Sequence, residues 1–415
     1  MSDVLDRFLG YVKIHSTSDM NNFDQTPSTA CQFDMAHKVA DELREMGCAD
    51  VKVDEHAYVT ATVPASAGAG DLPALGLCAH IDTTPDAPGK DVKPQVLDYD
   101  GGTLLIGHDT DGRPVTVSPE ETPGLETYAG DKFVCADGTT LLGADDKAAV
   151  AEIVSLAARL MAHPELPRPT LRLALVPDEE IGHGARLLDL EEFGAKWCYT
   201  VDGERTGSFM YECFNACMVE IMAHGVMVHP GTAKDIMVNA CTIIEQLDGM
   251  LPAHERPEHA DGYEGYYHMM GFEGTPAKAR ALYILRDFDA EKFAARKQMV
   301  ESAAAHLNEY YGEGTVEVTI TDQYRNMAEY LRDMPFLVEN GLTAIRAAGV
   351  EPKVEPIRGG TDGSQLTFRG LPCPNFSNGS LNCHGLKELE SVRGLEITVD
   401  ILQNLVALFA KPQEV

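Results

Sequence analysis

The sequence predicts an α/β fold with a mixed, mostly parallel sheet, helices on both of its faces, and an inserted two-layer domain. Three observations lead to this prediction. Short apolar runs alternate with helical patterns up to about residue 212, three of these runs end in histidine or acidic residues, and the order of elements changes near residue 213. A chain of 415 residues is also long for one hydrophobic core, so two domains are expected.

The composition indicates an ordinary globular protein with an acidic surface. It is 44% hydrophobic and 24% charged, with 33 basic and 65 acidic residues and a net charge of −32. This charge argues against binding to nucleic acid or to an anionic membrane. Ten scattered cysteines form no C-x-x-C pair, as expected in a reducing cytoplasm. We expect neither a signal peptide nor a membrane span, because no run approaches roughly 18 apolar residues.

The main domain is predicted to begin with residues 1–212. The segment 86–136 is rich in Gly, Pro and Asp, and we interpret it as an excursion at the sheet edge. The first helix is expected over residues 3–14 and the second along an apolar stripe from Met35 to Met46. The expected strands cover residues 51–53, 58–63, 75–79, 170–176 and 197–201.

An inserted lid or dimerisation domain is predicted over residues 213–324, with the order β-α-β-β-α-β. Residues 325–415 then return to the main domain. The inserted elements are expected at 218–223, 232–250, 266–270, 279–285, 290–310 and 316–321. The returning segment is expected to form helices at 335–348 and 390–410, with a polar glycine-rich loop at 358–363 between them.

Two adjacent carboxylates, Asp145 and Asp146, open an apolar helix. Because this helix is apolar nearly all round, we expect it to be buried. A carboxylate at the start of a buried helix is costly unless a cation meets it. A helix N-cap would explain one aspartate but not a pair. A metal ligand is therefore the sharper interpretation.

Further acidic residues and histidines follow three of the predicted strands. Taken singly, each has an ordinary explanation, such as a structural histidine, a solvated acidic turn or an Asp-Gly turn. Ligands of α/β sheets, however, bind beyond the carboxyl ends of the strands, so these ends are expected to face one site. The residues are His80 and Asp82, Glu179 and Glu180, Asp202 and, in a late loop, His384.

Together these residues favour a dinuclear metal site. Histidine and carboxylate ligands suit zinc, and two divalent ions can share a bridging carboxylate. The charges also balance, since three carboxylates and one hydroxide cancel two divalent ions. Zinc would lower the pKa of its water to about 7. Glu179 would then take the proton and deliver it to a leaving amine.

The motifs around these residues resemble the ligand set of the M20 cocatalytic metallopeptidases. The likeness is closest to the tripeptide aminopeptidases among them, and it runs from the N-terminal helices to about His384 and beyond. The matching motifs are His80-Ile-Asp82, Asp137–Lys147, Asp178-Glu-Glu180, Val201-Asp-Gly203, Phe214-Asn-Ala216, His229–Lys234, Gly262–Gly265, Arg286–Asp289, Ile357–Gly363 and Asn382-Cys-His384.

The resemblance implies a role for each residue at two zinc ions, for which cobalt or manganese could substitute. One ion would be held by His80 and Asp202 and the other by Glu180 and His384. The resemblance implies that Asp145 bridges the two ions and that Asp82 orients the histidine ligand. Glu179 is the implied general base.

The resemblance also implies residues that contact the substrate. His229 would help to polarise the scissile carbonyl, in related enzymes often across a dimer interface, so a homodimer through the inserted domain is an expectation. Asn215, Arg286 and Arg358 are candidates for contacts with substrate carbonyl and carboxylate groups, and an arginine fork suits a carboxylate. For Arg286, a surface salt bridge with a neighbouring aspartate is the plain alternative.

The expected function is a cytoplasmic zinc-dependent exopeptidase that removes the N-terminal residue from tripeptides. Another M20 amidohydrolase, such as a dipeptidase or an N-acyl amino acid deacylase, is one alternative. A non-catalytic peptide- or metal-binding protein on the same scaffold is another. The chain departs from the family pattern at Ala149, where glycine is common, and at Glu204, where a small residue is expected. Glu204 could change metal affinity or the preference at the substrate's amino end.

Overall fold

The computed structural model describes residues 3–203 and 205–413, so the expected effect of Glu204 lies outside the described residues. The chain divides into two compact units. The first contains the residues up to Tyr211, Glu329–Glu355 and the residues from Thr361 onward. The second contains Glu212–Ala328 and Pro356–Gly360. The sequence prediction had instead placed residues 356–360 in the main domain.

An eight-stranded sheet forms the centre of the first unit. Its order is β1-β2-β8-β3-β9-β16-β10-β15. β3 is parallel to both β8 and β9, and β9 is parallel to β16. At one edge, β2 is antiparallel to both of its neighbours, β1 and β8. The predicted mixed, mostly parallel sheet is therefore confirmed. Its strands are β1 (Ala49–Val53), β2 (Val59–Val63), β3 (Leu75–His80), β8 (Leu171–Val176), β9 (Trp197–Val201), β10 (Ser208–Met210), β15 (Lys353–Val354) and β16 (Asn375–Phe376).

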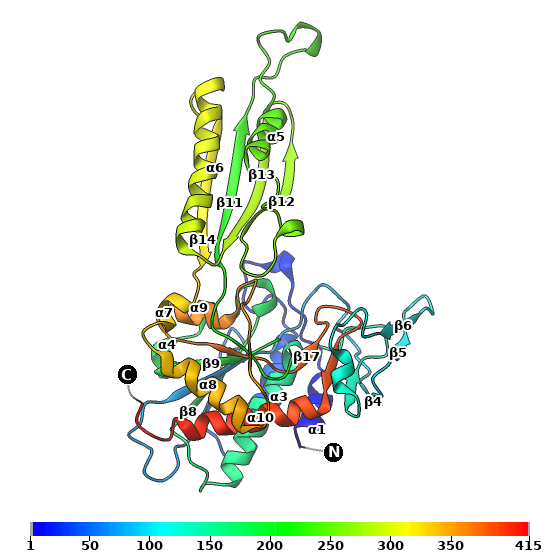
Figure 1. Ribbon diagram of the computed structural model, residues 1–415, viewed down its shortest axis with the longest axis vertical. Helices are drawn as coiled ribbons and strands as arrows, with labels where there is room; N and C mark the ends of the chain where they lie inside the picture. The colour runs from blue at the N-terminus through cyan, green and yellow to red at the C-terminus, as the bar shows by residue number, and fades with distance from the viewer. Residues whose placement is uncertain (1–2, 204, 414–415) are drawn as a thin grey trace. The chain divides into compact units, whose positions relative to one another are not determined.

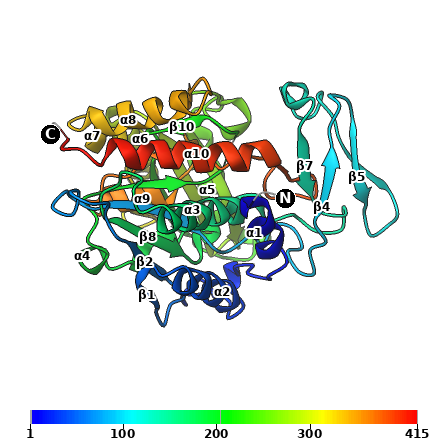
Figure 2. The same cartoon turned by 90° about the horizontal axis from the view of Figure 1, so that it is seen from below.

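Helices cover both faces of this sheet, as predicted. α3 (Ala144–Ala162) packs on β3 and is buried over most of its length, with α1 (Asp3–Tyr11) and α10 (Val392–Leu408) beside it (Figure 2). On the other face, Cys78 and Cys198 pack with Phe193 and Leu366. The remaining helices are α2 (Gln32–Glu45), α4 (Leu190–Phe193), α7 (Ala328–Leu331), α8 (Pro335–Ala347) and α9 (Asp362–Phe368).

The segment 86–136 does not lie on the edge of the large sheet, so that part of the prediction is wrong. β4 (Gln95–Asp98) and β7 (Lys132–Cys135) form a separate sheet of order β17-β18-β7-β4. Their partners, β17 (Ser380–Leu381) and β18 (Leu389–Ser391), come from the end of the chain. β5 and β6, residues 104–108 and 114–117, form a hairpin (Figure 1). An apolar cluster of their own stabilises these strands and includes Ile106, Val117, Phe133 and Leu389.

The second unit has the predicted β-α-β-β-α-β order. Its four strands form one antiparallel sheet of order β12-β13-β11-β14 (Figure 1). Both helices pack against one face, where they share a core with the strands. The elements are β11 (Asn215–His224), α5 (Ala240–Met250), β12 (Tyr266–Gly274), β13 (Lys278–Asp287), α6 (Ala290–Tyr311) and β14 (Val316–Tyr324).

Several helix boundaries differ from the prediction; the first helix, for example, ends at Tyr11 and not at residue 14. The helix expected from residue 232 begins at Ala240, because the Asn239 side chain accepts the N–H of Cys241 and caps the helix there. Residues 225–239 form an irregular segment instead, with a short 3₁₀ turn at Pro230–Thr232, and Ile236 in it is 56% exposed. The loop expected at 358–363 is shorter than predicted, since α9 begins at Asp362 behind a capping box made by Thr361 and Ser364.

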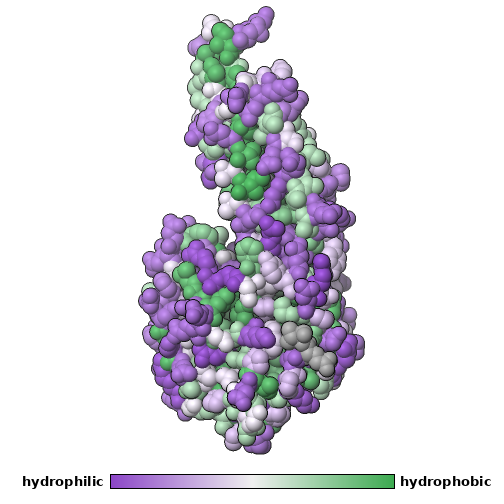
Figure 3. All heavy atoms as spheres, turned by 90° about the vertical axis from the view of Figure 1, so that its left-hand side faces the viewer, coloured by the Kyte–Doolittle hydropathy of each residue, from purple (hydrophilic) through white to green (hydrophobic). Residues whose placement is uncertain are grey.

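The surface is largely polar on one face of the molecule. On the face drawn in Figure 3 most side chains are hydrophilic, and apolar residues form smaller patches. None of the helices in residues 3–203 and 205–413 has both the length and the apolar character needed to cross a bilayer.

Candidate metal centre

Three strand ends of the large sheet and the start of α3 meet at one place. β3 ends in His80, the turn after β8 carries Glu180, and β9 is followed by Asp202. Because these strands are parallel neighbours, their carboxyl ends lie at the same edge of the sheet. Asp145 lies in the first turn of α3, and His384 comes from the loop between β17 and β18. The structure thus brings all five predicted ligands together.

Asp145 lies between the two histidines. Its Oδ1 is 3.0 Å from His80 Nε2, and its Oδ2 is 3.5 Å from His384 Nε2. His80 Nε2 is also 3.8 Å from Asp202 Oδ1, and His384 Nε2 is 2.9 Å from Glu180 Oε2. Each carboxylate oxygen of Asp145 therefore faces one histidine–carboxylate pair. A carboxylate that bridges two metal ions needs this arrangement.

The side chains fit metal ions. Ligand atoms of His80, Asp145 and Glu180 all lie within 4.8 Å of one another, and so do those of His80, Asp146 and Asp202. The buried Oε1 of Glu180 has no hydrogen-bond partner within the described part of the chain. An orphaned buried oxygen is costly unless a ligand occupies it. Imidazole and carboxylate groups are the donors that zinc, manganese and cobalt accept.

Of the two adjacent aspartates, Asp145 is the better placed to bind metal. The carboxylate of Asp146 already accepts two hydrogen bonds, from the backbone N–H of His80 at 3.1 Å and from Asn378 Nδ2 at 2.8 Å. Asp146 thereby fixes the end of β3 against the start of α3. Asp145 is therefore the candidate ligand of this pair.

The site holds more negative charge than its own cations can balance. Burial raises the pKa of Asp202 well above its usual range and that of Glu180 to about 7. Burial acts in the same direction on Asp145, but hydrogen bonds from His384 and His80 outweigh it and lower the pKa of this carboxyl. Bonds to Asp145 and Glu180 raise the pKa of His384 to about 11. Divalent cations would relieve the repulsion among these carboxylates.

Asp82 orients more of the site than the sequence predicted. The backbone carbonyl of Asp82 lies 3.1 Å from Nδ1 of His80, and its Oδ1 lies 3.3 Å from the same nitrogen. Its carboxylate also accepts the backbone N–H groups of Glu179 at 3.0 Å and Glu180 at 3.2 Å. One fully buried carboxylate therefore aligns an imidazole ligand and the turn that carries Glu179.

Glu179, the candidate general base, lies beside the candidate ligands. It lies next to Glu180 on a 3₁₀ turn, and part of its side chain remains accessible. Burial raises the pKa of its carboxyl well above the usual range, while His80 acts in the opposite direction. A carboxylate with a raised pKa is matched to general acid–base work near neutral pH.

Glu388 is a part of the site that sequence reasoning missed. Its side chain is 1% exposed, and it accepts the backbone N–H groups of Leu142 at 2.9 Å, Gly143 at 2.7 Å and Asp145 at 3.0 Å. Backbone dihedrals become helical only at Lys147, so the segment before it depends on these bonds. A lone glutamate far along the chain gives no sequence signal for this role.

Two other carboxylates also support the ligands. Asp178 accepts the N–H of Ser28 at 2.7 Å, its hydroxyl at 2.6 Å and Gln32 Nε2 at 2.6 Å, which ties the turn before Glu179 to the N-terminal segment. Asp86 Oδ2 lies 3.2 Å from Nδ1 of His384. The position of Asp178 directly before Glu179 and Glu180 could have suggested its supporting role. Nothing in the sequence indicated that Asp86 would contact His384.

The four predicted substrate residues all lie in the second unit. Asn215 is fully buried: its Nδ2 donates to the carbonyls of Asp287 and Phe288, and its Oδ1 accepts the N–H of Asn326. Both amide hydrogens of this side chain are therefore used within the unit. Here Asn215 holds two strands together.

The other three predicted substrate residues also make contacts within the second unit. Arg286 Nη1 donates to two backbone carbonyls, and its guanidinium lies 5.4 Å from the ring centroid of Tyr324. Arg358 donates to the carbonyls of Ala260, Gly262 and Glu264. The exposed His229 accepts the N–H of Gly231 through Nδ1, which leaves Nε2 available. Arg358 is thus also the anchor of the loop that contains the Gly262–Gly265 motif.

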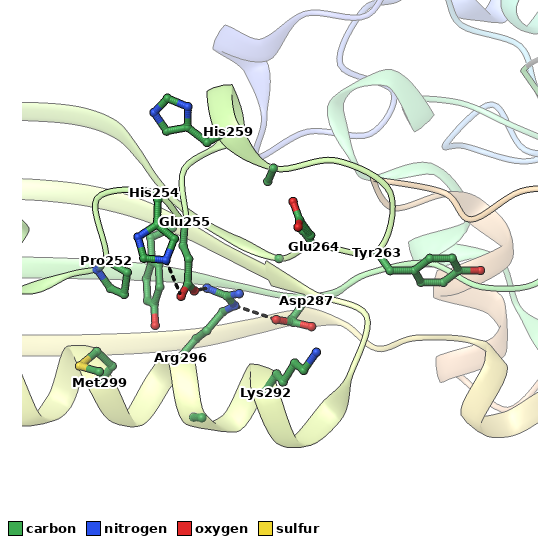
Figure 4. Close-up of a pocket in the computed structure, with 14 residues that line it drawn as sticks. Pro252, His254, Glu255, His259, Tyr263, Glu264, Asp287, Lys292, Arg296 and Met299 are labelled. Carbon is green, nitrogen blue, oxygen red and sulfur yellow. Dashed lines mark hydrogen bonds and ion pairs between the residues drawn. The ribbon is translucent and has the colours of Figure 1, made fainter.

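This loop borders a pocket of about 960 Å³ in the second unit (Figure 4). Arg296 lies at its centre, paired with Asp287 at 2.8 Å and with Glu255. Tyr263 and Glu264 contribute to its wall. The central charges are paired with one another, so the pocket has no set of groups comparable to the metal centre.

Comparisons with known proteins agree with this geometry. Residues 211–315 match the family described as the peptidase dimerisation domain. The chain is 45% identical over 412 residues to the protein named Peptidase T from Caldanaerobacter subterraneus subsp. tengcongensis, covering 99% of this chain and 100% of that one. Two solved structures share the fold at 21% identity and a TM-score of 0.76. They are an aminopeptidase PepT from Bacillus cereus, with 99% of this chain and 98% of that one covered, and a tripeptidase from Staphylococcus aureus, with 98% of each covered.

Proposed function

The chain belongs to the peptidase T family of M20 peptidases, and we propose that it is a zinc-dependent aminopeptidase that releases the N-terminal residue from tripeptides. The observation that carries the proposal is the position of Asp145, with one carboxylate oxygen facing His80 and the other facing His384. The name of the tripeptidase from Staphylococcus aureus supports the choice of substrate.

In the proposed centre, His80 and Asp202 would hold one ion, Glu180 and His384 would hold the other, and Asp145 would contribute to both. Bound there, the ions would polarise the scissile carbonyl and activate a water molecule. Glu179 takes the proton from the attacking water and passes it to the leaving amine. Asp82 keeps the His80 ring and the Glu179 turn in place during both proton transfers.

Residues of the second unit recognise the substrate in this proposal. Arg286 and Arg358 offer N–H groups to the carbonyl and carboxylate oxygens of the peptide, since a guanidinium matches a carboxylate. His229 polarises the scissile carbonyl with its free Nε2, and the chain forms a homodimer through the second unit. The match of residues 211–315 to a peptidase dimerisation domain supports the dimer. Asn215 has no remaining amide hydrogen, so we assign it no substrate contact.

A free tripeptide and its N-acetylated twin would test the proposal, with product masses measured for zinc-loaded and metal-stripped protein. We expect zinc-dependent release of the first residue from the free peptide alone. Cleavage of the acetylated twin would instead indicate a deacylase or another M20 amidohydrolase. If zinc-loaded protein cleaves neither peptide, the scaffold has a binding role and the aminopeptidase proposal fails.

A further inference from the structure

A second set of buried oxygens lies beside α3, outside the metal centre. It consists of Glu152 on α3, Glu390 on β18, Thr398 on α10 and Thr206 before β10. Both carboxylate oxygens of each glutamate and both threonine hydroxyls are buried and have no hydrogen-bond partner among the residues that the structure describes. Glu152, Glu390 and Thr398 are all 0% exposed. Buried polar atoms are normally satisfied, so six orphaned oxygens in one region need an explanation.

Pairwise proximities connect the four side chains: Glu152 lies near Glu390 and Thr398, and Glu390 lies near Thr206. α3 packs against both α10 and β18. Burial raises the pKa of Glu152, and the charge of nearby Glu390 raises it further. The Thr398 hydroxyl lies close enough to lower this pKa, although the two groups make no hydrogen bond of regular geometry. Glu390 Oε1 and Thr206 Oγ1 each lie 2.9 Å from the position that a Cβ at Gly379 would occupy. These two oxygens are therefore neighbours, and the glycine leaves open the space that they share.

Neighbouring carboxylates show that this cluster is unusual. Glu388 and Asp131 both act on Glu390 through their charge. Glu388, however, accepts three backbone N–H groups, and Asp131 accepts the Ser391 hydroxyl and the N–H of Arg393. Those two carboxylates accept regular hydrogen bonds. In contrast, the contacts of Glu152 with the Thr398 hydroxyl and of Glu390 with the backbone N–H of Ser391 fall short of regular hydrogen-bond geometry. Their neighbours add negative charge and supply no counter-ion.

We propose that Glu152, Glu390, Thr206 and Thr398 bind a structural calcium ion. The cluster offers oxygen atoms only, which hard cations prefer, and it lacks the nitrogen and sulfur donors that favour zinc. Two carboxylates match the charge of a divalent ion. Calcium takes about six to eight oxygens in irregular geometry, whereas magnesium demands a near-ideal octahedron. Such an ion would join α3, β18 and α10 behind the helix that begins with Asp145.

The test measures calcium in the full-length protein at saturating zinc. Protein prepared with millimolar Ca²⁺ is passed through gel filtration, and bound calcium is determined by mass spectrometry of the metals. We expect about one calcium ion per chain that zinc does not displace, and a higher thermal unfolding midpoint with calcium than without it. If the wild-type protein carries no calcium under these conditions, the oxygens hold only water and the proposal is overturned.

Variants separate this cluster from weak binding to the acidic surface. Glu390→Gln should lose the calcium and the shift in midpoint. Thr398→Val keeps the shape and the charge, so it should fold and bind calcium more weakly. Asp131→Asn is the matched control, a neighbouring buried carboxylate that the protein satisfies, and it should keep the calcium. Calcium retained in both Glu390→Gln and Thr398→Val would place the ion elsewhere and refute the assignment.

Discussion

The substitution Glu388→Gln tests how the ligand Asp145 is held. One oxygen of Glu388 accepts the N–H groups of Leu142 and Gly143, and the other accepts the N–H of Asp145. A glutamine can keep the first pair of bonds, but its amide nitrogen then faces the N–H of Asp145. The lost bond involves a charged acceptor and is worth about 1.5–3 kcal/mol, and a buried donor remains unsatisfied.

This loss should appear first in metal binding. Removing a group that orients a metal ligand typically costs about 10–100-fold in affinity. We expect a weakening of that order for zinc, measured by competition with a chromophoric chelator, and a partial recovery of kcat in excess zinc. Asp131→Asn, which removes a buried carboxylate away from the ligands, should leave zinc affinity unchanged. The reasoning would be refuted if Glu388→Gln unfolded more easily but bound zinc as tightly as the wild type.

Three further substitutions test other parts of the account. Asp82→Asn should weaken zinc binding about 10–100-fold, because its carboxylate orients both His80 and the turn after β8; unchanged affinity would contradict that role. Asn239→Ala should lower the free energy of unfolding by about 1 kcal/mol in denaturant titrations, whereas Thr232→Ala, at the wrongly predicted helix start, should have little effect. Gly184→Ala should lower the free energy of unfolding by about 1–3 kcal/mol, because the new Cβ would collide with Asp362. An unfolding midpoint equal to that of the wild type would contradict this and show that the loop shifts to accommodate the Cβ.

The ligands could be read from the sequence because regular elements carry them. His80 and Asp202 directly end or follow parallel strands, and the physical rule for such sheets brings their ends together. Asp145 was visible as a carboxylate at the start of a buried helix. A local pattern placed each of these side chains, but only the whole set along the chain, with its resemblance to a known family, made them candidate ligands.

The supporting contacts could not be read in this way. Glu388 bonds to a residue 243 positions earlier, and a single glutamate near a short strand resembles any solvated acid. The sheet that joins β4 and β7 to β17 and β18 likewise depends on pairing between distant segments.

The start of α5 was missed for a different reason. The apolar residue Ile236 fits the helical period but lies in a loop, and the cap at Asn239 decides where the helix begins.

The most direct test of the central claim is a zinc titration of metal-stripped protein with a free tripeptide as substrate. The account predicts that activity appears with added zinc and saturates when two ions are bound per chain. The variant Glu179→Ala should bind the same two ions and release no product. Full activity without metal, saturation at a single ion, or near-normal turnover by Glu179→Ala would contradict the account.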